Sequence, residues 1–338
     1  MFLFSFFVII KGKNIIEIFE WIKMHKERLI RKVAELYYIH DISQRNISAK
    51  LGFSRVKINR LLKEAKRRKI IQFNIVSNVQ EKRISELENL LETKYKLKEA
   101  IIYYDSDIKD PSDDVIFKEV GLAAADYIER ILDDNLNIAV TWGKTLFHAI
   151  ENIKIEKKYP NIKLFSTLGG VSLTRSEYQN NNLTNLLAEK LGCLSYPIYL
   201  PLISNEPLNK DIIEKEKAIY EILGSTSKID YLLTGVGLMS PESKLFTYTR
   251  FESDFIKMIR NKEIIGEICW NFFNSNGEFV KTGMENYFVN IPVPELKKIK
   301  SKVAVAFGKE KIEVLKAFLI TNIADIFITD SITAESLV

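Results

Sequence analysis

The sequence is poor in the residues that build disulfide frameworks and metal sites. Its 338 residues include two cysteines, Cys193 and Cys269, and no Cys-x-x-Cys pair. The three histidines, His25, His40 and His148, lie too far apart in the chain to form a metal or protease motif. These absences exclude a disulfide-stapled fold and a cysteine zinc site. They predict no metal and no cofactor, and they fit a cytoplasmic protein.

Glycine, proline and long apolar runs are also scarce. The 14 Gly and 8 Pro exclude collagen-like and low-complexity chains. Residues 1–10, MFLFSFFVII, are apolar except for Ser5, but a membrane span needs about 20 such residues. The stretch also lacks the preceding Lys/Arg and the cleavage site of a signal peptide. We therefore expect no membrane association, while 46% hydrophobic residues are ample for a packed core.

The net charge of +5 is unevenly distributed along the chain. Residues 24–70 carry 14 Lys/Arg and 4 Asp/Glu, a net charge of +10, whereas residues 1–23 carry +1 and residues 71–338 carry −6. A basic block beside a mildly acidic body predicts a nucleic-acid-binding module joined to a second domain. Met24 directly precedes this block, so residues 1–23 are either an N-terminal extension or lie ahead of a natural start at Met24; the sequence leaves both open.

The basic block has the pattern of three short helices. Apolar residues recur on one face between Glu27 and Tyr38, and Ser43 can cap a second helix over residues 44–51. Gly52 follows as a helix-ending residue. Ser54 can cap a third helix, whose inner stripe at i, i+3, i+4 and i+7 comprises Ile58, Leu61, Leu62 and Ala65. Two short helices joined by a tight glycine turn predict a helix-turn-helix.

The third helix would then be the recognition helix, lying in the major groove of DNA. Arg can bind guanine, Asn can bind adenine, and Val56 can contact a thymine methyl, whereas Lys66 to Lys69 suit phosphates. A three-helix packing unit with a solvated basic face is the alternative. The predicted DNA-binding residues are Ser54, Arg55, Val56, Lys57, Asn59, Arg60, Lys63 and Lys66.

Two segments follow the predicted helix-turn-helix. Lys69–Val76 is β-rich and could close the module as a strand or wing. Val79–Tyr95 has helical spacing, as either a linker helix that pairs two subunits or a helix packed on the body. Pairing would let two heads read half-sites one helical turn apart, which predicts a homodimer or larger homo-oligomer.

Beyond Lys98 the sequence alternates short β-branched runs with helical stretches, which predicts an α/β domain with a mostly parallel sheet. The expected strands begin at Ala100, Asn137, Lys163, Tyr231, Val303 and Ile326, and the expected helices cover residues 120–132, 183–191, 212–223 and 310–320.

Three glycine turns follow expected strands, where ligands bind in such sheets. They are TWGKT at residues 141–145, LGG at 168–170 and FGKEK at 307–311. Each alone is typical of an ordinary turn that connects a strand to a helix. Together, with lysine in two of them, they favour an anion site built from backbone N–H groups and lysines. The sequence contains no Walker A motif, dinucleotide fingerprint, Ser/His/Asp set or unusual carboxylate pair.

In order and content, these elements resemble the SorC (SorC/DeoR-type) family of bacterial transcriptional regulators, from about Arg31 to the last residue. The pieces that carry the resemblance are VAELYYIHDISQRNISAKLGFSRVKINRLLKEAKRRKII, KLKEAIIYY, IAVTWGKTL, TLGG, LLTGVG, IIGEICWNFFNSNG, VAVAFGKEK and FITDSITAESLV. The resemblance implies an N-terminal all-α helix-turn-helix domain and a Rossmann-like α/β effector domain similar to sugar-phosphate isomerases and deaminases. It further implies a phosphorylated sugar effector, and homodimers or homotetramers.

The resemblance also assigns effector-binding residues, which are Gly143, Lys144, Thr145, Gly169, Gly170, Glu267 and Lys311. This chain departs from the family where Phe307 replaces a usual Gly, where Trp270-Asn271 replaces a common Gly-Arg, and where Lys144 replaces a frequent Arg or Thr. The last change keeps a cation without bidentate geometry.

The predicted domains are residues 1–23 as an N-terminal extension, 24–76 as the DNA-binding domain, 77–98 as a linker helix and 99–338 as the effector domain. We expect a non-enzymatic regulator of a carbohydrate-utilisation operon that binds operator DNA under control of a phosphorylated sugar. The alternatives are a sugar-phosphate isomerase or deaminase with an appended DNA-binding head, and a nucleoid-type binder that uses the head alone.

Overall fold

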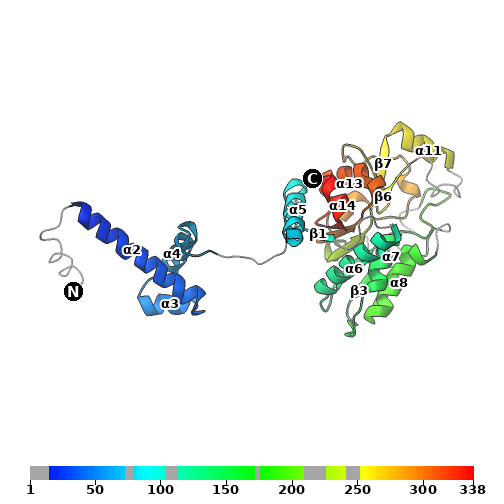
Figure 1. The fold of residues 1–338 in the computed structure, drawn as a ribbon. Helices are drawn as coiled ribbons and strands as arrows, with labels where there is room; N and C mark the ends of the chain where they lie inside the picture. Colours follow the sequence, from blue (N-terminus) through cyan, green and yellow to red (C-terminus); the bar gives the residue numbers. More distant parts are fainter. Residues whose placement is uncertain (1–14, 73–78, 104–112, 172–175, 209–225, 241–251) are drawn as a thin grey trace. The chain divides into compact units, whose positions relative to one another are not determined.

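The chain divides into two separately packed units, residues 1–77 and residues 78–338. A computed structural model describes residues 15–72, 79–103, 113–171, 176–208, 226–240 and 252–338 (Figure 1). Each unit has its own hydrophobic core among these residues: one core lies within the first unit, and two clusters on opposite faces of a sheet form the core of the second.

The first unit consists of α2 (Ile15–Tyr38), α3 (Gln44–Leu51) and α4 (Arg55–Arg67). Ser43 caps α3 by accepting from the Asn46 N–H, and Gly52 ends it in the left-handed conformation with φ 69°. Ser54 caps α4 through the Lys57 N–H. Both predicted caps and the predicted glycine turn are confirmed, as is the buried stripe Ile58, Leu61, Leu62 and Ala65.

The strand or wing predicted for residues 69–76 is not present in residues 69–72, the part of this segment that the structure describes. Residues 69–72 form a turn and a bend, not a strand, and residues 73–76 lie outside the described residues. Lys69 has a positive φ of 55°, and the N–H groups of Lys69 and Ile70 bond back to carbonyls of Lys66 and Ala65. Because those N–H groups are used by the helix end, they do not form a strand ladder here.

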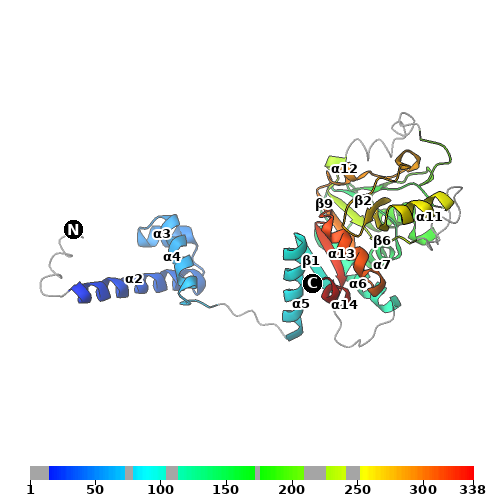
Figure 2. The same ribbon diagram turned by 90° about the horizontal axis from the view of Figure 1, so that it is seen from above.

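The second unit is built on a seven-stranded parallel sheet in the order β1-β10-β9-β5-β2-β3-β4. Figure 2 shows this unit from above. The expected α/β class is confirmed, and all six expected strands are present. The strands are β1 (Glu99–Tyr103), β2 (Asn137–Val140), β3 (Lys163–Ser166), β4 (Leu194–Tyr196), β5 (Tyr231–Thr234), β9 (Ser301–Val305) and β10 (Ile326–Asp330).

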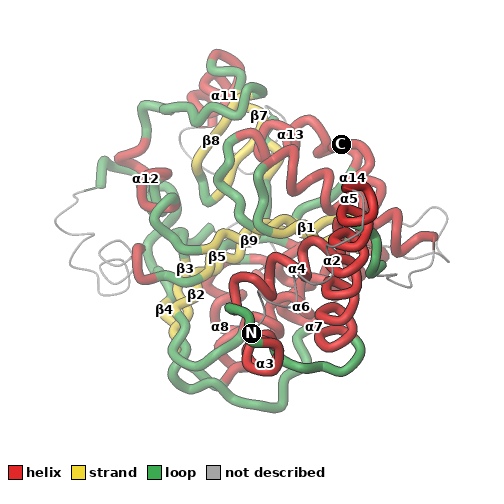
Figure 3. Tube along the Cα trace, turned by 90° about the vertical axis from the view of Figure 1, so that its left-hand side faces the viewer, coloured by secondary structure: helices red, strands yellow, loops and turns green. Residues whose placement is uncertain are grey.

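Helices cover both faces of the sheet (Figure 3). Alternate strand residues point to opposite sides, so that Ile326 and Ile328 join one hydrophobic cluster and Phe327 joins the other. One face carries α6 (Asp113–Ile131), α7 (Lys144–Asn152) and α8 (Asn180–Leu191). The other carries α5 (Val79–Tyr95), α13 (Ile312–Ile320) and α14 (Ser331–Leu337).

Helix α5 has the predicted bounds and packs on the body. Its Leu87, Leu91 and Tyr95 are buried in the same cluster as α13 and α14. Its Glu92 and Glu88 carboxylates accept the N–H groups of Ala100 and Ile102 at 3.0 and 3.1 Å. These two bonds occupy N–H groups on the open edge of β1, so the helix is an integral part of the second unit.

A second, three-stranded sheet was not predicted from the sequence. It comprises β6 (Gly237–Leu238), β7 (Ile264–Ile268) and β8 (Asn271–Asn274), all antiparallel. Two more helices, α11 (Glu252–Asn261) and α12 (Val293–Leu296), complete the unit among the described residues. The helix predicted over residues 212–223 lies outside the described residues.

Candidate functional site

The eight residues predicted to bind DNA are the N-cap Ser54 and seven residues on the outer face of α4. Each of the eight is exposed, and Val56 is 80% exposed despite its apolar side chain. The Lys57 ammonium lies 3.7 Å from the centre of the Phe53 ring, which holds its side chain at the start of the helix. A solvent-facing row of cations and amides that begins at a capped helix N-terminus has the form needed to enter a major groove.

Two other cations of this helix are engaged within it. Arg67 and Arg68 both bind Glu64, at 2.7 and 2.6 Å. The hydrogen bonds from Arg67 and then Arg68 lower the pKa of Glu64 to about 2. This carboxylate therefore stays ionised and partly neutralises the end of α4 that sequence reasoning assigned to phosphates.

In the second unit, the candidate effector turns lie at one edge of the sheet. Strands β2 and β5 are neighbours, but the chain leaves β2 toward β3 and leaves β5 toward β9, on opposite sides. Such a reversal places a crevice beyond the carboxyl ends of the two strands. The Thr141 N–H donates to Leu233 O at 3.0 Å. The turn that follows β2 therefore begins beside the end of β5.

The TWGKT turn is fixed by contacts with other residues of the second unit. Gly143, with φ 129°, precedes α7, and its N–H donates to Tyr178 O at 3.0 Å. Thr145 is buried in the packing of α7. Lys144 is half-buried, with its ammonium 4.1 Å from the centre of the Phe117 ring. Of the three predicted residues in this turn, the lysine is therefore the one suited to meet an anion.

Phe307 explains one departure from the family pattern. Its ring packs edge-to-face on Phe117, with centroids 4.7 Å apart, and is 5% exposed. Phe117 therefore contacts both Lys144 and Phe307. Phe307 lies in the turn that follows β9, so the Lys144 and Phe307 departures are linked through one aromatic ring.

The two glycines of the LGG turn make different contacts. A Cβ on Gly169 would lie 2.6–2.7 Å from the backbone of residues 200–202, whereas one on Gly170 would meet nothing closer than Leu200 O at 3.9 Å. The Gly170 N–H donates to Leu200 O, and its carbonyl accepts from Leu202 N–H. The close backbone approach that Gly169 allows is thus to its own chain.

Glu267 lies at the centre of the candidate site and is 4% exposed. It is on β7 opposite Gly237, where a Cβ would overlap its carboxylate. Burial raises the pKa of Glu267 to about 7, against the lowering effects of the Trp270 N–H, the Trp142 indole and Lys311. The Trp270 N–H donates to the carboxylate at 2.9 Å.

Lys311 lies on the other side of the turn that follows β5. Its ammonium donates to Val236 O at 3.2 Å, and burial lowers its pKa. Glu267 and Lys311 therefore flank Val236 and Gly237. The structure brings the Lys144, Glu267 and Lys311 segments to the same edge of the sheet. Trp142, which precedes Lys144 in its turn, contacts Trp270 edge-to-face with ring centroids 5.7 Å apart.

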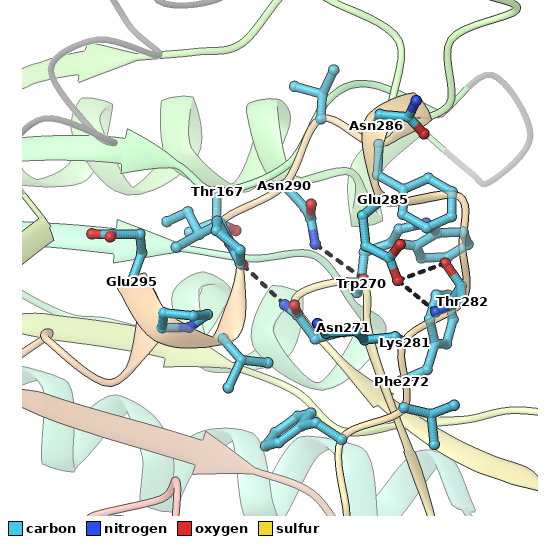
Figure 4. Close-up of a pocket in the computed structure, with 18 of the residues that line it drawn as sticks. Thr167, Trp270, Asn271, Phe272, Lys281, Thr282, Glu285, Asn286, Asn290 and Glu295 are labelled. Carbon is cyan, nitrogen blue, oxygen red and sulfur yellow. Dashed lines mark hydrogen bonds between the residues drawn. The ribbon is translucent and has the colours of Figure 1, made fainter. Parts of the chain in front are cut away.

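The hairpin between β7 and β8 turns through two residues that both have positive φ. Cys269 and Trp270 have φ 49° and 56°, a conformation that usually needs Gly or Asn. The side-chain amide of Asn290 donates to both their carbonyls, and Asn271 donates to Cys269 O and Ile291 O. Figure 4 shows the bond from Asn290 to Trp270. These bonds, with Glu267 on the Trp270 N–H, offset the backbone strain.

A cavity of about 950 Å³ lies against the other side of this hairpin (Figure 4). Its wall is mainly apolar, and its polar groups include Thr167 and Glu285, which accepts from the Thr282 hydroxyl at 3.0 Å. None of the seven predicted effector residues lines it. Sequence reasoning missed this cavity, and the one signal for it was the Trp270-Asn271 departure, because both residues line it.

Two further features are absent from the described segments. No helix among them is both long and apolar enough to cross a bilayer. No group of three or more His, Cys, Asp or Glu side chains in them is placed to hold a metal ion.

Comparisons with known proteins agree over nearly the whole chain. The sequence profile of the Sugar-bind family, described as "Putative sugar-binding domain", matches residues 80–338. The deoxyribonucleoside regulator of Bacillus subtilis (strain 168) is 26% identical over 315 residues, which cover 93% of this chain and 98% of that protein. The sorbitol operon regulator of Klebsiella pneumoniae is 27% identical over 316 residues, covering 92% and 97%.

Solved structures give the same result. The full-length sorbitol operon regulator SorC from Klebsiella pneumoniae matches with a TM-score of 0.68 at 27% identity, over 92% of this chain and 98% of that one. A DeoR family transcriptional regulator from Listeria monocytogenes matches with a TM-score of 0.67 at 25% identity, over 76% and 100%. This chain therefore belongs to the Sugar-bind family and, with these relatives, to the SorC-type sugar-binding transcriptional regulators.

Proposed function

We propose that this chain is a DNA-binding transcriptional regulator of a carbohydrate-utilisation operon and that a phosphorylated sugar controls its DNA binding. The observation that carries the proposal is the exposed, capped recognition helix α4 in a unit of its own, joined to a parallel-sheet unit with lysines at its ligand-binding edge. Relatives named as regulators of sorbitol, erythritol and deoxyribonucleoside use support the carbohydrate assignment.

The effector would act by changing the balance between two conformations that differ in affinity for DNA. The size of that change is limited by how much more tightly the effector binds one conformation than the other. Lys144 is the residue we assign to the effector phosphate, with Lys311 near it. The body carries a net charge of −6, so an anion must be held by such local cations and not by a general attractive field.

A thermal-shift screen of sugar phosphates, each paired with its unphosphorylated parent sugar, tests the effector class. A ligand of the folded state must raise its apparent melting temperature. We expect a response to one or more sugar phosphates and none to the parent sugars. Equal responses to a sugar and its phosphate would refute the phosphate requirement, and no response to either would refute the effector class.

Lys144→Met is the matching variant, with Lys309→Met as its control. Lys309 is an exposed lysine of the FGKEK turn. Loss of a charge-assisted bond costs about 1.5–3 kcal/mol, which corresponds to a roughly tenfold to hundredfold weaker effector affinity for Lys144→Met. An equal loss in both variants would mean that the lysines act only through general charge.

We also propose that the protein acts in the cytoplasm as a homodimer or homotetramer. The small size of the helix-turn-helix unit supports this, because one such unit makes few base contacts and a second copy would read a second half-site. Sedimentation of the full chain measures the assembly directly. A monomer at the concentration that binds DNA would exclude it.

An enzyme remains the alternative function because Glu267 is a buried carboxyl with a pKa of about 7, which suits general acid–base catalysis. Its carboxylate, however, is bonded to the Trp270 N–H, and the relatives are named regulators. Turnover of sugar phosphates by the purified chain at enzymatic rates, lost in Glu267→Gln, would favour the enzyme.

A further inference from the structure

Helix α14 binds the FGKEK turn at its start. The Gly308 N–H donates to the Thr333 hydroxyl oxygen at 3.0 Å, and that hydroxyl donates to the Asp330 carboxylate. Asp330 also caps the helix by accepting from the N–H groups of Ile332 and Thr333, at 2.9 and 3.0 Å. Thr333 is 1% exposed. A change in the conformation of the turn at Gly308 must therefore alter its hydrogen bond to the buried Thr333.

The same helix binds α5 at its end. The Tyr95 hydroxyl donates to Leu337 O at 2.8 Å in a buried contact, and the Lys94 ammonium donates to Leu337 O at 2.8 Å and Val338 O at 3.0 Å. The Leu337 side chain is fully buried. Figures 1 and 2 both show α14 and the C-terminus beside α5. The last turn of α5 is thus held by the backbone of α14.

Helix α5 is the first element of the second unit. The first unit ends at Ser77 and α5 begins at Val79, so the chain runs from the DNA-binding unit directly into this helix. Among the described elements of the second unit, α5 is therefore the nearest in sequence to the DNA-binding unit.

We propose that α14 couples the FGKEK turn to α5, so that effector binding at this edge of the sheet changes the anchoring of α5. The roles of the effector and of DNA in this inference rest on the proposed function. The coupling itself concerns only contacts within the second unit. Thr333 and Leu337 are four residues apart in one short helix, so a displacement at one is transmitted to the other through the helix backbone. Such coupling is reciprocal: a change at α5 must also affect the turn.

Amide hydrogen exchange on the full chain tests the coupling without effector or DNA. Thr333→Val removes the hydroxyl with little change of shape. Loss of one hydrogen bond corresponds to roughly fivefold faster exchange, and we expect this at Gly308 and also in the last turn of α5, residues 91–95. The control is Ser336→Ala, whose hydroxyl bonds Ile332 O on the exposed side of α14, and it should leave α5 unchanged.

The reverse variant, Tyr95→Phe, should speed exchange at Gly308 and keeps the test valid if Thr333→Val does not fold. Faster exchange confined to Gly308 in Thr333→Val, or confined to α5 and Leu337 in Tyr95→Phe, would overturn the coupling. A chain that fails to respond to sugar phosphates but shows both reciprocal effects would contradict the proposed effector class and leave the coupling intact.

Discussion

At the scale of single residues, Gly169 and Gly170 are neighbours in sequence that should respond very differently to one added methyl group. Alanine at Gly169 would place its Cβ 2.6–2.7 Å from backbone atoms of residues 200–202, which cannot move without breaking the strand-like pairing there. We expect Gly169→Ala to lower the free energy of unfolding by about 1–3 kcal/mol. Gly170→Ala, with its nearest atom at 3.9 Å, should change it by less than about 0.5 kcal/mol.

Urea denaturation of the two variants checks this difference. Trp142 and Trp270 report on the second unit if the third tryptophan, Trp21, is replaced by Phe. Equal stabilities of the two alanine variants would show that the Gly169 contact is not required. In that case the need for glycine at the LGG turn would have to come from a ligand.

The buried carboxyl of Glu267 predicts a pH dependence of stability. Its pKa in the folded chain, about 7, lies above the ordinary value of 4.5. Between these two values the folded chain binds a proton that the unfolded chain releases, so the free energy of unfolding falls as pH rises from about 4.5 to 7. The fall attributable to this group is about 3 kcal/mol, and it is absent above and below the window.

Glu267→Gln should remove that slope, because an amide does not titrate. The measurement is the free energy of unfolding at pH 5.5, 6.5 and 7.5 for both proteins, again by urea. Cys269, the buried thiol near Glu267, has its pKa raised further above this range by burial and does not contribute. Parallel pH profiles for the two proteins would contradict the raised pKa.

At the scale of elements, helix α4 is expected to contain both base-reading and phosphate-binding residues. Arg55 lies at the exposed N-terminal end, which we expect to enter the groove, whereas Lys66 lies in the last turn. Arg55→Ala should lower affinity for the preferred DNA site by about 1–3 kcal/mol more than for random DNA. Lys66→Ala should weaken binding to both about equally and reduce the salt dependence by about one phosphate contact.

Binding titrations on a site selected from random sequences, at two or more salt concentrations, distinguish the two roles. Equal losses on the selected and random DNA for Arg55→Ala would exclude base reading at that position. Arg67 is a useful comparison, because its pairing with Glu64 should make Arg67→Ala less costly than Lys66→Ala.

The elements that sequence predicted best are those with local chemical signals. Ser43, Gly52 and Ser54 fixed the borders of α3 and α4, because caps and a left-handed glycine act within a few residues. The β7–β8 hairpin had no such signal. Its turn residues, Cys269 and Trp270, adopt positive φ without being Gly or Asn, and they are stabilised by Asn290, which lies about twenty positions away in the sequence.

The same distinction applies to the candidate site. The turns after β2, β3 and β9 could be predicted because parallel strands end at one edge of a sheet. That Gly143 N–H bonds Tyr178 O, or that Lys144 rests on Phe117, depends on segments far apart in sequence. The apolar cavity beside Trp270 is lined mostly by residues between Trp270 and Glu295, closed by Thr167, Ile198 and Leu208 from other segments. The Trp270-Asn271 departure marked its place in the sequence, but how these segments close around a cavity could not be predicted.

At the scale of the whole molecule, the two units should unfold independently. The hydrophobic cluster of the first unit is confined to residues 29–71, and those of the second draw on residues from 84 to 337. Because the described residues of these cores do not overlap, we expect the stability of one unit not to depend on the other. We therefore expect a fragment of residues 78–338 to have the same urea midpoint, within experimental error, as the second unit has in the full chain.

That fragment should also lack DNA binding, since the net charge of +10 lies within residues 24–70 and residues 71–338 carry −6. A destabilising substitution in the first core, such as Ile58→Ala, is expected to cost about 2–5 kcal/mol in the first unit only. The fluorescence of Trp142 and Trp270 should then stay unchanged while the first unit unfolds. A lowered urea midpoint for the second unit, in either the fragment or this variant, would mean that the two units stabilise each other. The effect of DNA binding could then reach the second unit by direct contact between the units as well as through α5.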